Sequence, residues 1–129
     1  MLDFFLPMNP PTMTYQTGRI VERNGKVVRY PSPGWAAARA KLESSLVPFR
    51  PPEPLDGPLR LTVKWIWQNK RARLFRWKAT RPDCDNLAKG FNDCMTRLGF
   101  WHDDAQIASL VVEKAYGPQP GIYVVVEQL

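Results

Sequence analysis

The stretch RPDCDNLAKGFNDCMTRLG, residues 81–99, decides the fold because it specifies one strongly amphipathic helix. On a helical wheel at 100° per residue, a helix over residues 85–98 places its large apolar side chains within an arc of about 100°. These residues are Leu87, Phe91, Cys94, Met95 and Leu98. Gly99 follows at once and suits the left-handed conformation that commonly ends a helix. The helix therefore presents one face to a hydrophobic core and one to solvent.

The solvent face of this helix is charged. It carries Asp85, Lys89, Asn92 and Asp93. Asp85 is placed to cap the helix or to lie in its first turn, where the helix dipole favours a carboxylate. Lys89 lies four residues from each of the two aspartates, which suits an ion pair with either. The pattern predicts a row of charges along the exposed side of the helix.

Further aspartates flank the helix at both ends. Asp83 stands just before it, and the segment FWHDDAQ, residues 100–106, adds Asp103 and Asp104 just after it. The chain turns back in this segment toward the next predicted strand. We expect the turn to bring Asp103 and Asp104 toward Asp83 and Asp85, so that the carboxylates gather in one place.

Outward from this helix, the sequence alternates between strand patterns and turn residues. Strands are predicted at LDFFL (residues 2–6), at LRLTVKWIW (59–67) and on both sides of the turn GPQPG (117–121). In the second of these, apolar and polar residues alternate, which indicates a strand with one buried face. RIVERNGKVVRY, residues 19–30, predicts a hairpin because Asn-Gly is the favoured two-residue turn.

Another helix is predicted at SPGWAAARAKLESSL, residues 32–46, with Ser32 as its cap and an apolar stripe at helical spacing. The proline-rich linker that follows, residues 48–58, is expected to be extended and exposed. Residues 68–80 show no period and are expected to form a mobile basic loop. We therefore predict a single small α+β domain over residues 1–129, in which a mixed β-sheet with hairpins packs against two main helices.

The composition constrains where the protein works. No run of about 18 apolar residues is present, so we expect no segment that crosses a membrane. The N-terminal MLDFFLPMNPP lacks the basic start and long apolar stretch of a signal peptide. Cys84 and Cys94 have no histidine or cysteine at zinc-ligand spacing and are expected to be reduced. These features predict a cytoplasmic protein.

Basic residues are concentrated in one segment. The net charge is +6, and eight of the 18 lysines and arginines lie in residues 60–81, which contain no acid. Aromatic residues are interleaved with them, namely Trp65, Trp67, Phe75 and Trp77. Cationic side chains bind phosphates and aromatic rings stack on bases, so the segment points to a nucleic acid. A solvated basic surface is the plainer alternative.

Aspartates beside such a segment require a physical reason. Two carboxylates 5 Å apart repel by roughly 3 kcal/mol at an effective dielectric constant near 20, and both repel phosphate. A divalent cation removes both problems, and aspartate oxygens suit Mg²⁺. Such an ion makes a bound water more acidic and stabilises charge during phosphodiester hydrolysis. Lys89, one helical turn after Asp85, is placed to stabilise charge on the same phosphate.

A structural interpretation stays open for each of these residues. A lone D-x-D, here Asp83 and Asp85, is often a solvated pair or a helix cap. Lys89 alone is more often an ion-pair partner within its helix. His102 is a candidate general base, although a single histidine is more often structural. Asp93, late in the helix, is expected to support its neighbours or the fold.

The sequence RPDCDNLAKGFNDCMTRLGFWHDDAQIASLVVEK, residues 81–114, closely resembles the core of the RusA family of Holliday junction resolvases. The family pattern is D-x-D-N-L-x-K, an aspartate in the same helix, and then W-x-D-D-x-Q. The matching residues are Asp83, Asp85, Asn86, Leu87, Lys89, Asp93, Trp101, Asp103, Asp104 and Gln106. Residues 68–80 are longer and more aromatic than the family minimum would require.

The resemblance implies a small homodimeric endonuclease with a mixed α/β fold, dependent on Mg²⁺ with Mn²⁺ as a substitute ion. It implies paired symmetric nicks in four-way DNA junctions, in recombination and repair, and a phage or prophage origin. By the same resemblance, Asp83, Asp85 and Asp104 are the essential carboxylates and metal ligands, and Lys89 is the catalytic lysine. Asp103 is expected to support the metal site.

The predicted contacts to the DNA backbone are Lys70, Arg71, Arg73, Arg76, Lys78 and Arg81. Two other classes of function stay open. One is a protein that binds junctions or other branched DNA without cutting it and uses its aspartates structurally. The other is a metal-dependent glycosyl- or nucleotidyl-transferase, in which D-x-D holds a metal–diphosphate. The chain has no glycine-rich phosphate-binding loop to support the latter.

Overall fold

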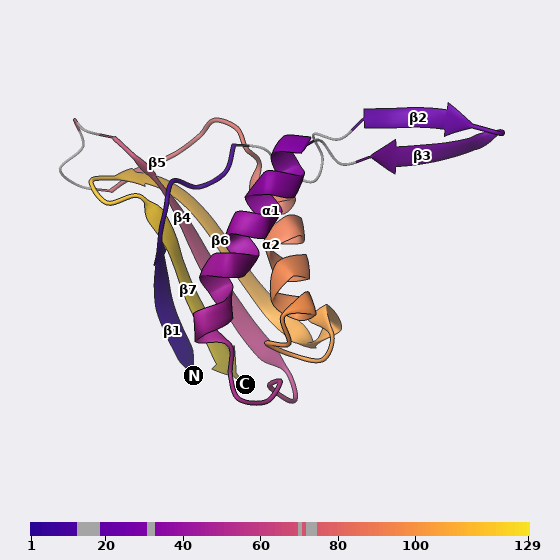
Figure 1. The fold of residues 1–129 in the computed structure, drawn as a ribbon. Coiled ribbons are helices and arrows are strands. Elements are labelled where there is room, and N and C mark those ends of the chain that lie inside the picture. Colours follow the sequence, from indigo (N-terminus) through magenta and orange to yellow (C-terminus); the bar gives the residue numbers. More distant parts are fainter. Residues whose placement is uncertain (13–18, 31–32, 70, 72–74) are drawn as a thin grey trace.

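A mixed five-stranded sheet, with two α-helices on one of its faces, forms the body of the molecule (Figure 1). The computed structural model describes residues 1–12, 19–30, 33–69, 71 and 75–129. A separate two-stranded hairpin lies beside this body. The predicted α+β class, with a mixed sheet against two main helices, is confirmed. No helix of the described residues is long and apolar enough to cross a membrane.

The sheet is built around strand β4 (Leu59–Gln68). β4 pairs in parallel with β6 (Ile107–Gly117) and antiparallel with β7 (Gly121–Gln128). β1 (Leu2–Pro7) lies antiparallel beside β7 at one edge of the sheet, and β5 (Arg76–Trp77) lies antiparallel beside β6 at the other. The resulting order is β1-β7-β4-β6-β5.

The two strands predicted around the turn at residues 117–121 are present as β6 and β7, which do not pair with each other because β4 lies between them. One expectation about this sheet was wrong. Residues 68–80 do not lack regular structure, because β5 forms within them. Two residues are too few to show a period, and β5 exists through its pairing with the edge of β6, which the hydrogen bond from Lys78 N to Lys114 O extends at 3.1 Å.

Burial along β4 follows the predicted alternation. Leu59, Leu61, Val63 and Trp65 are buried in one cluster with apolar residues of both helices. Polar residues such as Lys64 occupy the opposite face of the strand. Full burial of an aliphatic or aromatic side chain contributes on the order of 1.5–3 kcal/mol, so this alternation fixes which face the helices cover.

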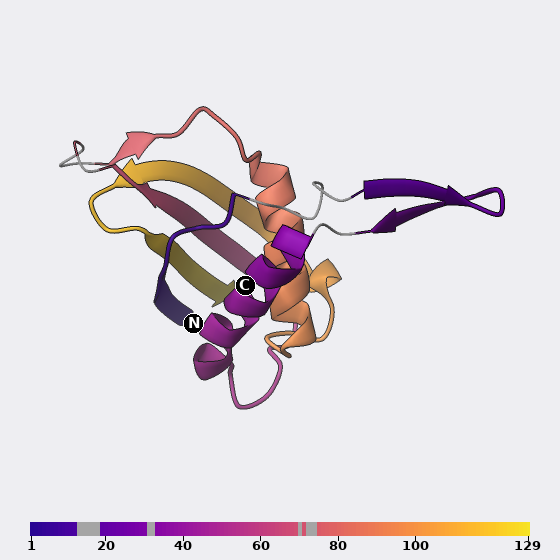
Figure 2. The ribbon, with the colours of Figure 1, turned by 45° about the horizontal axis from the view of Figure 1, so that its top comes forward.

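The helices α1 (Pro33–Leu46) and α2 (Cys84–Arg97) lie side by side across one face of the sheet (Figures 1 and 2). Both begin and end close to the predicted positions. Trp35 of α1 packs against Gly90 of α2, where a larger residue would collide with the indole ring. After α2, Gly99 adopts a φ of 83°, the left-handed conformation predicted for it. The close approach at Gly90 brings the two helices together over the core.

The hairpin of β2 (Arg19–Arg23) and β3 (Lys26–Tyr30) projects away from the body of the molecule (Figure 2). Its turn has φ values of 51° at Asn24 and 74° at Gly25, as the Asn-Gly signal predicted. The expected cap of α1, Ser32, lies outside the described residues.

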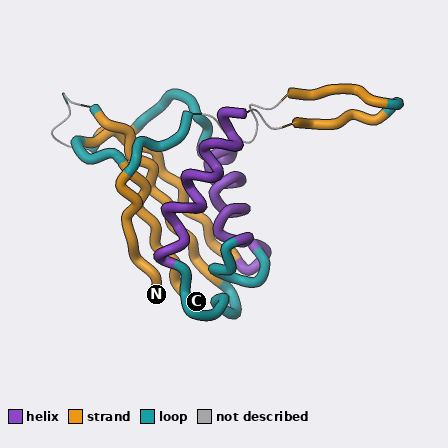
Figure 3. Tube along the Cα trace, in the orientation of Figure 1, coloured by secondary structure: helices purple, strands orange, loops and turns teal. Residues whose placement is uncertain are grey.

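The proline-rich linker between α1 and β4 is mostly an exposed loop, as predicted (Figure 3). It begins with a short 3₁₀ helix, η2 (Val47–Phe49). Leu55 then forms an isolated bridge to Trp101, which follows α2. The linker is therefore anchored beside the turn that carries the second group of aspartates.

Candidate active site

The first group of candidate residues lies at the start of α2. Asp83 is the N-cap residue, and its carbonyl oxygen accepts the first helical hydrogen bond from Leu87 N at 3.1 Å. Its carboxylate makes no capping hydrogen bond. Asp85 lies in the first turn, as predicted, and both aspartate side chains are exposed. The D-x-D thus presents its carboxylates to solvent at the positive end of a helix dipole.

Lys114 of β6 fixes the segment that leads into α2. Its Nζ donates to the carbonyl oxygens of Thr80 at 2.7 Å and Pro82 at 2.8 Å. Pro82 directly precedes Asp83, so these two bonds hold the backbone of the D-x-D against the sheet. Charge-assisted hydrogen bonds of this kind are roughly twice as strong as neutral ones. Lys114 therefore acts on the backbone position of Asp83 from a distant part of the chain.

The two cysteines belong to the same helix and are both free. Cys84 Sγ contacts the carbonyl oxygen of Val112 at 3.7 Å, which adds a second link between the start of α2 and β6. Cys94 is buried in the core, and this burial is the main reason why its pKa is raised to about 11. Cys94 therefore stays a thiol at neutral pH and serves packing rather than nucleophilic chemistry.

The second group of aspartates lies at the 3₁₀ helix η3 (Asp104–Gln106), which packs against α2. Asp103 caps η3, since its carboxylate accepts from Ala105 N at 2.9 Å. The pKa of Asp104 is raised, first by partial desolvation, then by a hydrogen bond with Asp103 and the negative charges of Asp103 and Asp93. The charge of Asp93 on α2 thus acts on Asp104 across the contact between α2 and η3.

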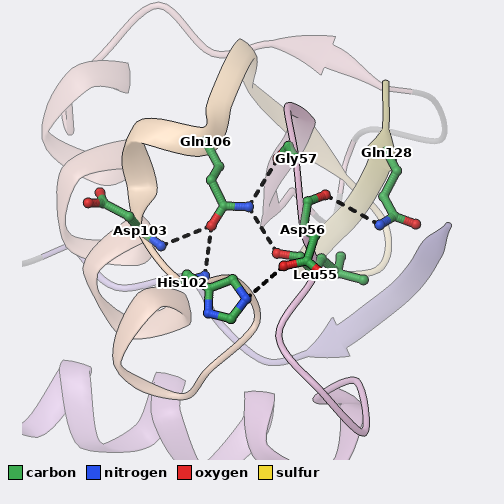
Figure 4. A network of polar contacts seen from close by, with 7 residues as sticks. All are labelled: Leu55, Asp56, Gly57, His102, Asp103, Gln106 and Gln128. Carbon is green, nitrogen blue, oxygen red and sulfur yellow. Dashed lines mark hydrogen bonds and ion pairs between the residues drawn. The ribbon is translucent and has the colours of Figure 1, made fainter.

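Gln106 fixes the turn that carries these aspartates (Figure 4). Its Oε1 accepts from the backbone N–H groups of His102 at 2.8 Å and Asp103 at 3.0 Å. Its Nε2 donates to the carbonyl oxygens of Leu55 at 2.9 Å and Gly57 at 3.0 Å. All hydrogen-bonding positions of the amide are thereby used. The carboxylate of Asp103 points away from this network. Gln106 therefore holds the backbone of Asp103, and the Asp103 carboxylate is free to cap η3.

His102, the candidate general base, faces the linker. Its Nε2 lies 2.9 Å from Oδ1 of Asp56, and both side chains are exposed. The neighbouring Phe100 and Trp101 are buried and pack in the core. His102 is therefore directed toward Asp56 and belongs to the network around Gln106 rather than to the charged face of α2.

The candidate carboxylates form a row along α2 rather than one cluster. Among the residues that the structure describes, no three carboxylate, imidazole or thiol side chains lie close enough together to hold a metal ion. Asp85 and Asp93 are separated by about 12 Å along the helix axis, since a helix rises 1.5 Å per residue. Asp104 lies near Asp93, at the later part of this row, and Lys89 lies between the two helix aspartates. The expected convergence of Asp103 and Asp104 on the D-x-D is not what the fold brings about.

The D-x-D nevertheless suits a hard divalent cation. Asp83 and Asp85 offer oxygen ligands, and both are exposed. Mg²⁺ is commonly held by one or two carboxylates, with waters and substrate phosphates filling its remaining positions, and does not need a closed cage of protein ligands. The donor chemistry of this pair therefore fits Mg²⁺.

The basic residues predicted to contact DNA differ in their surroundings. Arg71, Arg76 and Arg81 are exposed, whereas Lys70 and Arg73 lie outside the described residues. Lys78 is half-buried instead.

The ammonium group of Lys78 is engaged within the protein. Its Nζ donates to Thr80 Oγ1 at 2.7 Å and to the Tyr116 hydroxyl at 3.1 Å, and it lies 5.2 Å from the ring centroid of Trp67. Lys78 therefore stabilises the segment after β5, and the exposed arginines are better placed to reach a DNA backbone.

Lys114 was not among the residues selected from the sequence, although a signal was present. Val112, Lys114 and Tyr116 alternate along β6, so the lysine falls on a face that also carries an apolar residue. A charge at such a position needs a partner. Its partners, the carbonyl groups of Thr80 and Pro82, cannot be inferred from spacing.

Comparisons with known proteins agree with the motif. The model of the family described as Endodeoxyribonuclease RusA matches residues 7–127. The crossover junction endodeoxyribonuclease rusA of Lactococcus phage r1t is 36% identical over 107 residues, which cover 81% of this chain and 79% of the phage protein. The uncharacterized protein YqaN of Bacillus subtilis (strain 168) is 36% identical over 50 residues, 39% of this chain and 34% of that protein. The chain therefore belongs to the RusA family of endodeoxyribonucleases, enzymes that hydrolyse phosphodiester bonds of DNA.

Proposed function

We propose that this endonuclease is Mg²⁺-dependent and resolves four-way DNA junctions by paired symmetric nicks. The observation that carries the proposal is the exposed D-x-D of Asp83 and Asp85 at the start of α2, beside the cationic edge of the sheet. The name of the phage relative, a crossover junction endodeoxyribonuclease, supports a junction as the substrate. DNA recombination and repair in the cytoplasm, in a phage or prophage context, is the corresponding role.

In the proposed site, Asp83 and Asp85 would hold the metal ion directly. Asp104, with Asp103 in support, would complete the set of ligands if binding of metal and DNA draws η3 toward the start of α2, because the described residues by themselves form no cluster of three carboxylates. When bound, Mg²⁺, or Mn²⁺ in its place, makes a coordinated water more acidic and neutralises phosphate charge. The carboxylates of Asp83 and Asp85 would supply the oxygen ligands that hold this ion at the start of α2. Lys89 contacts that phosphate and stabilises the negative charge that develops on its oxygens.

The DNA backbone is held beside this site by cationic side chains. Arg76 and Arg81 are exposed on either side of the segment that leads to α2, and Arg71 precedes them. Lys70, Arg73 and Lys78 complete the proposed set. Such contacts position the duplex arms without reading their sequence.

We further propose that residues 1–129 act as one domain and that two copies form a homodimer. A four-way junction can present two-fold symmetry, and a two-fold dimer presents two equivalent active sites to opposite strands. Paired nicks require this arrangement, because each site cuts one strand.

The first test is cleavage of a four-way junction with each strand labelled in turn. Wild-type protein and Asp85→Asn are compared in Mg²⁺, in Mn²⁺ and in a chelator, with the matched linear duplex as substrate control. Glu53→Gln, which neutralises an exposed acid of the linker, is the matched protein control. We expect metal-dependent paired nicks that Asp85→Asn abolishes and Glu53→Gln retains, while junction binding survives in both variants.

A non-catalytic junction-binding protein is the second candidate, favoured by the lack of a three-carboxylate cluster in the described part of the chain. Tight junction binding without nicks in either metal would support this candidate and contradict the proposed activity. If the protein neither binds nor nicks the junction, a four-way junction is excluded as the substrate.

A further inference from the structure

We propose that the edge of the sheet at β5 carries a stacking site for one unpaired nucleotide of the DNA substrate. Phe75 and Trp77 provide the stacking surface, and Lys64 and Arg76 lie beside it. The proposal rests on the proposed function, because a branched or locally opened substrate offers unpaired bases whereas an intact duplex does not.

The two aromatic side chains are unusually exposed. The exposed fraction is 62% for Phe75 and 74% for Trp77. Trp77 pairs with Ala115 of β6, which in turn pairs with Ile66 of β4. Ile66 alternates with the residues of β4 that face the helices, so this aromatic surface lies on the helix-free face. Large apolar side chains that are this exposed and adjacent typically mark a binding surface.

Two hollows flank the Phe75 ring. One, of about 170 Å³, is lined by Lys64, Phe75, Arg76, Trp77 and Ala115. The other, of about 290 Å³, is lined by Phe5, Lys64, Ile66, Phe75, Gln119 and Tyr123. Both are smaller than the roughly 300–1,000 Å³ of typical small-molecule sites. Each hollow therefore suits one planar ring system rather than an extended ligand.

The charges around these rings favour a nucleotide over an uncharged apolar partner. Lys64 Nζ lies 5.6 Å from the centroid of Phe75 and 3.9 Å from Oε1 of Glu113. Arg76 is exposed between the two aromatic residues. Because Arg76 alternates with Trp77 along the edge strand, its side chain turns toward the helix-covered face. A base can stack on the rings while its phosphate passes around the open edge toward Arg76, and stacking combined with a nearby cation is how proteins bind single-stranded nucleic acids. Stacking is independent of base identity, so the site would select structure rather than sequence.

The stacking surface is linked directly to the D-x-D. After Trp77 the chain stays on β6, since Lys78 N donates to Lys114 O at 3.1 Å. The side chain of Lys114 then holds Pro82, the residue before Asp83. β5 is the edge strand, so the two sites are neighbours around one open edge of the sheet. A strand whose phosphate lies at the D-x-D can therefore place a nearby unpaired base on the aromatic surface.

The test is equilibrium binding in a chelator, where no cleavage is needed. The probes are a labelled 12-nucleotide single strand, a four-way junction and a linear duplex, measured by fluorescence anisotropy. The variants are Trp77→Ala and Trp77→Phe, with Val111→Ala, an exposed apolar residue elsewhere on β6, as control. We expect Trp77→Ala to bind the single strand and the junction about 5- to 150-fold more weakly, the range that one base–aromatic stack supplies.

Several further results would distinguish base stacking on Trp77 from other modes of DNA binding. Binding of the linear duplex should stay within about twofold, and Trp77→Phe should restore most of the lost affinity because a ring remains. The dependence of log affinity on log salt should not change in Trp77→Ala, because an indole neutralises no phosphate. In the wild-type protein, a single strand containing 5-iodouracil should cross-link to Phe75 or Trp77, a result that requires no variant to fold.

The proposal is overturned if Trp77→Ala binds single strands and junctions as the wild type does, if it loses duplex binding equally, or if cross-links fall elsewhere. It is also overturned if Trp77→Ala converts a dimer to a monomer, because a second copy of the chain would then cover the surface. Loss of nicking activity alone bears on the proposed function, whereas these binding results bear only on the stacking site.

Discussion

The pKa of Asp104 is raised, mainly by partial desolvation of its carboxyl group and further by a hydrogen bond with Asp103 and the negative charges of Asp103 and Asp93. The folded protein therefore binds this proton more tightly than the unfolded chain does. The resulting stabilisation of the fold is fully present at pH values below the pKa that Asp104 has in the unfolded chain. It is lost as the pH rises through the higher pKa that Asp104 has in the folded protein. At neutral pH, ionised Asp104 is thus a source of repulsion that a bound cation would relieve.

We predict that Asp104→Asn raises the thermal unfolding midpoint at pH 7 on the order of 1–2 °C, as relief of a screened surface repulsion would. The gain should vanish near pH 3, where the wild-type carboxyl is protonated as well. Added Mg²⁺ should stabilise the wild type more than the variant if Asp104 is a ligand. Thermal melts monitored by circular dichroism measure all three effects, and Glu53→Gln is the control.

A lower unfolding midpoint for Asp104→Asn at pH 7 would contradict the repulsion. Equal stabilisation of the two proteins by Mg²⁺ would contradict a role for Asp104 as a ligand and leave the D-x-D as the metal-binding pair.

Elements with a clear period were predictable, and those decided by distant partners were not. α2 followed from its apolar arc, the β2–β3 hairpin from Asn-Gly, and β4 from alternation. β5 is two residues long and depends on β6 for its pairing. The insertion of β4 between β6 and β7 is likewise a tertiary outcome, in which this apolar strand takes a central position in the sheet beneath the helices.

The site was predictable in composition but not in arrangement. The spacing of the motif selected the aspartates at the start of α2 and at η3, which packs against α2. Their mutual placement depends on where η3 packs along a helix of 14 residues, a tertiary question. The contacts of Lys114 and Gln106 join segments more than 30 residues apart, so no local pattern reveals them.

Where β6 meets the start of α2, we predict that Lys114→Met reduces nicking of four-way DNA about 10- to 100-fold. This is the usual effect of losing a residue that orients the ligands of a metal without binding the metal itself. The reason is that Asp83 loses the hydrogen bonds that fix its backbone. Because the effect is on position, the Mg²⁺ concentration for half-maximal nicking should rise. Nicking assays across a Mg²⁺ titration provide the measurement.

Lys114→Arg should recover part of the activity, since a guanidinium can donate to the same carbonyl groups. Lys41→Met, an exposed lysine of α1, is the matched control. If Lys114→Met nicks junctions with unchanged rate and unchanged Mg²⁺ requirement, Lys114 does not position Asp83.

The whole molecule separates its functions by location. The carboxylates line α2 on the helix-covered face of the sheet, the aromatic residues Phe75 and Trp77 lie on the opposite face, and the exposed Arg76 belongs to the edge strand β5. A net charge of +6 adds a long-range attraction for DNA that does not depend on these details. Affinity and selectivity should therefore respond to different substitutions.

For affinity, we predict that neutralising Lys70, Arg71 and Arg73 to glutamine flattens the dependence of log affinity on log salt. Each lost phosphate contact should lower the slope by roughly 0.9 for duplex DNA. Junction and duplex binding should weaken together, because phosphate contacts carry no structural selectivity. Titrations at several KCl concentrations measure the slope, with Arg39→Gln and Lys41→Gln of α1 as the charge-matched control. An unchanged slope would remove this segment from the DNA interface.

The residues that hold the two groups of aspartates in place, Gln106 and Lys114, lie just before and within a single strand, β6. Gln106 directly precedes β6, and Lys114 lies eight residues later within it. One inserted residue between them would shift one group by about 3.3 Å and turn the following side chains to the other face. Length changes in the β2–β3 hairpin or in the proline-rich linker before Leu55 would leave that interval untouched. Evolution of this enzyme can therefore lengthen or shorten those segments freely, whereas the interval from Gln106 to Lys114 has a fixed length.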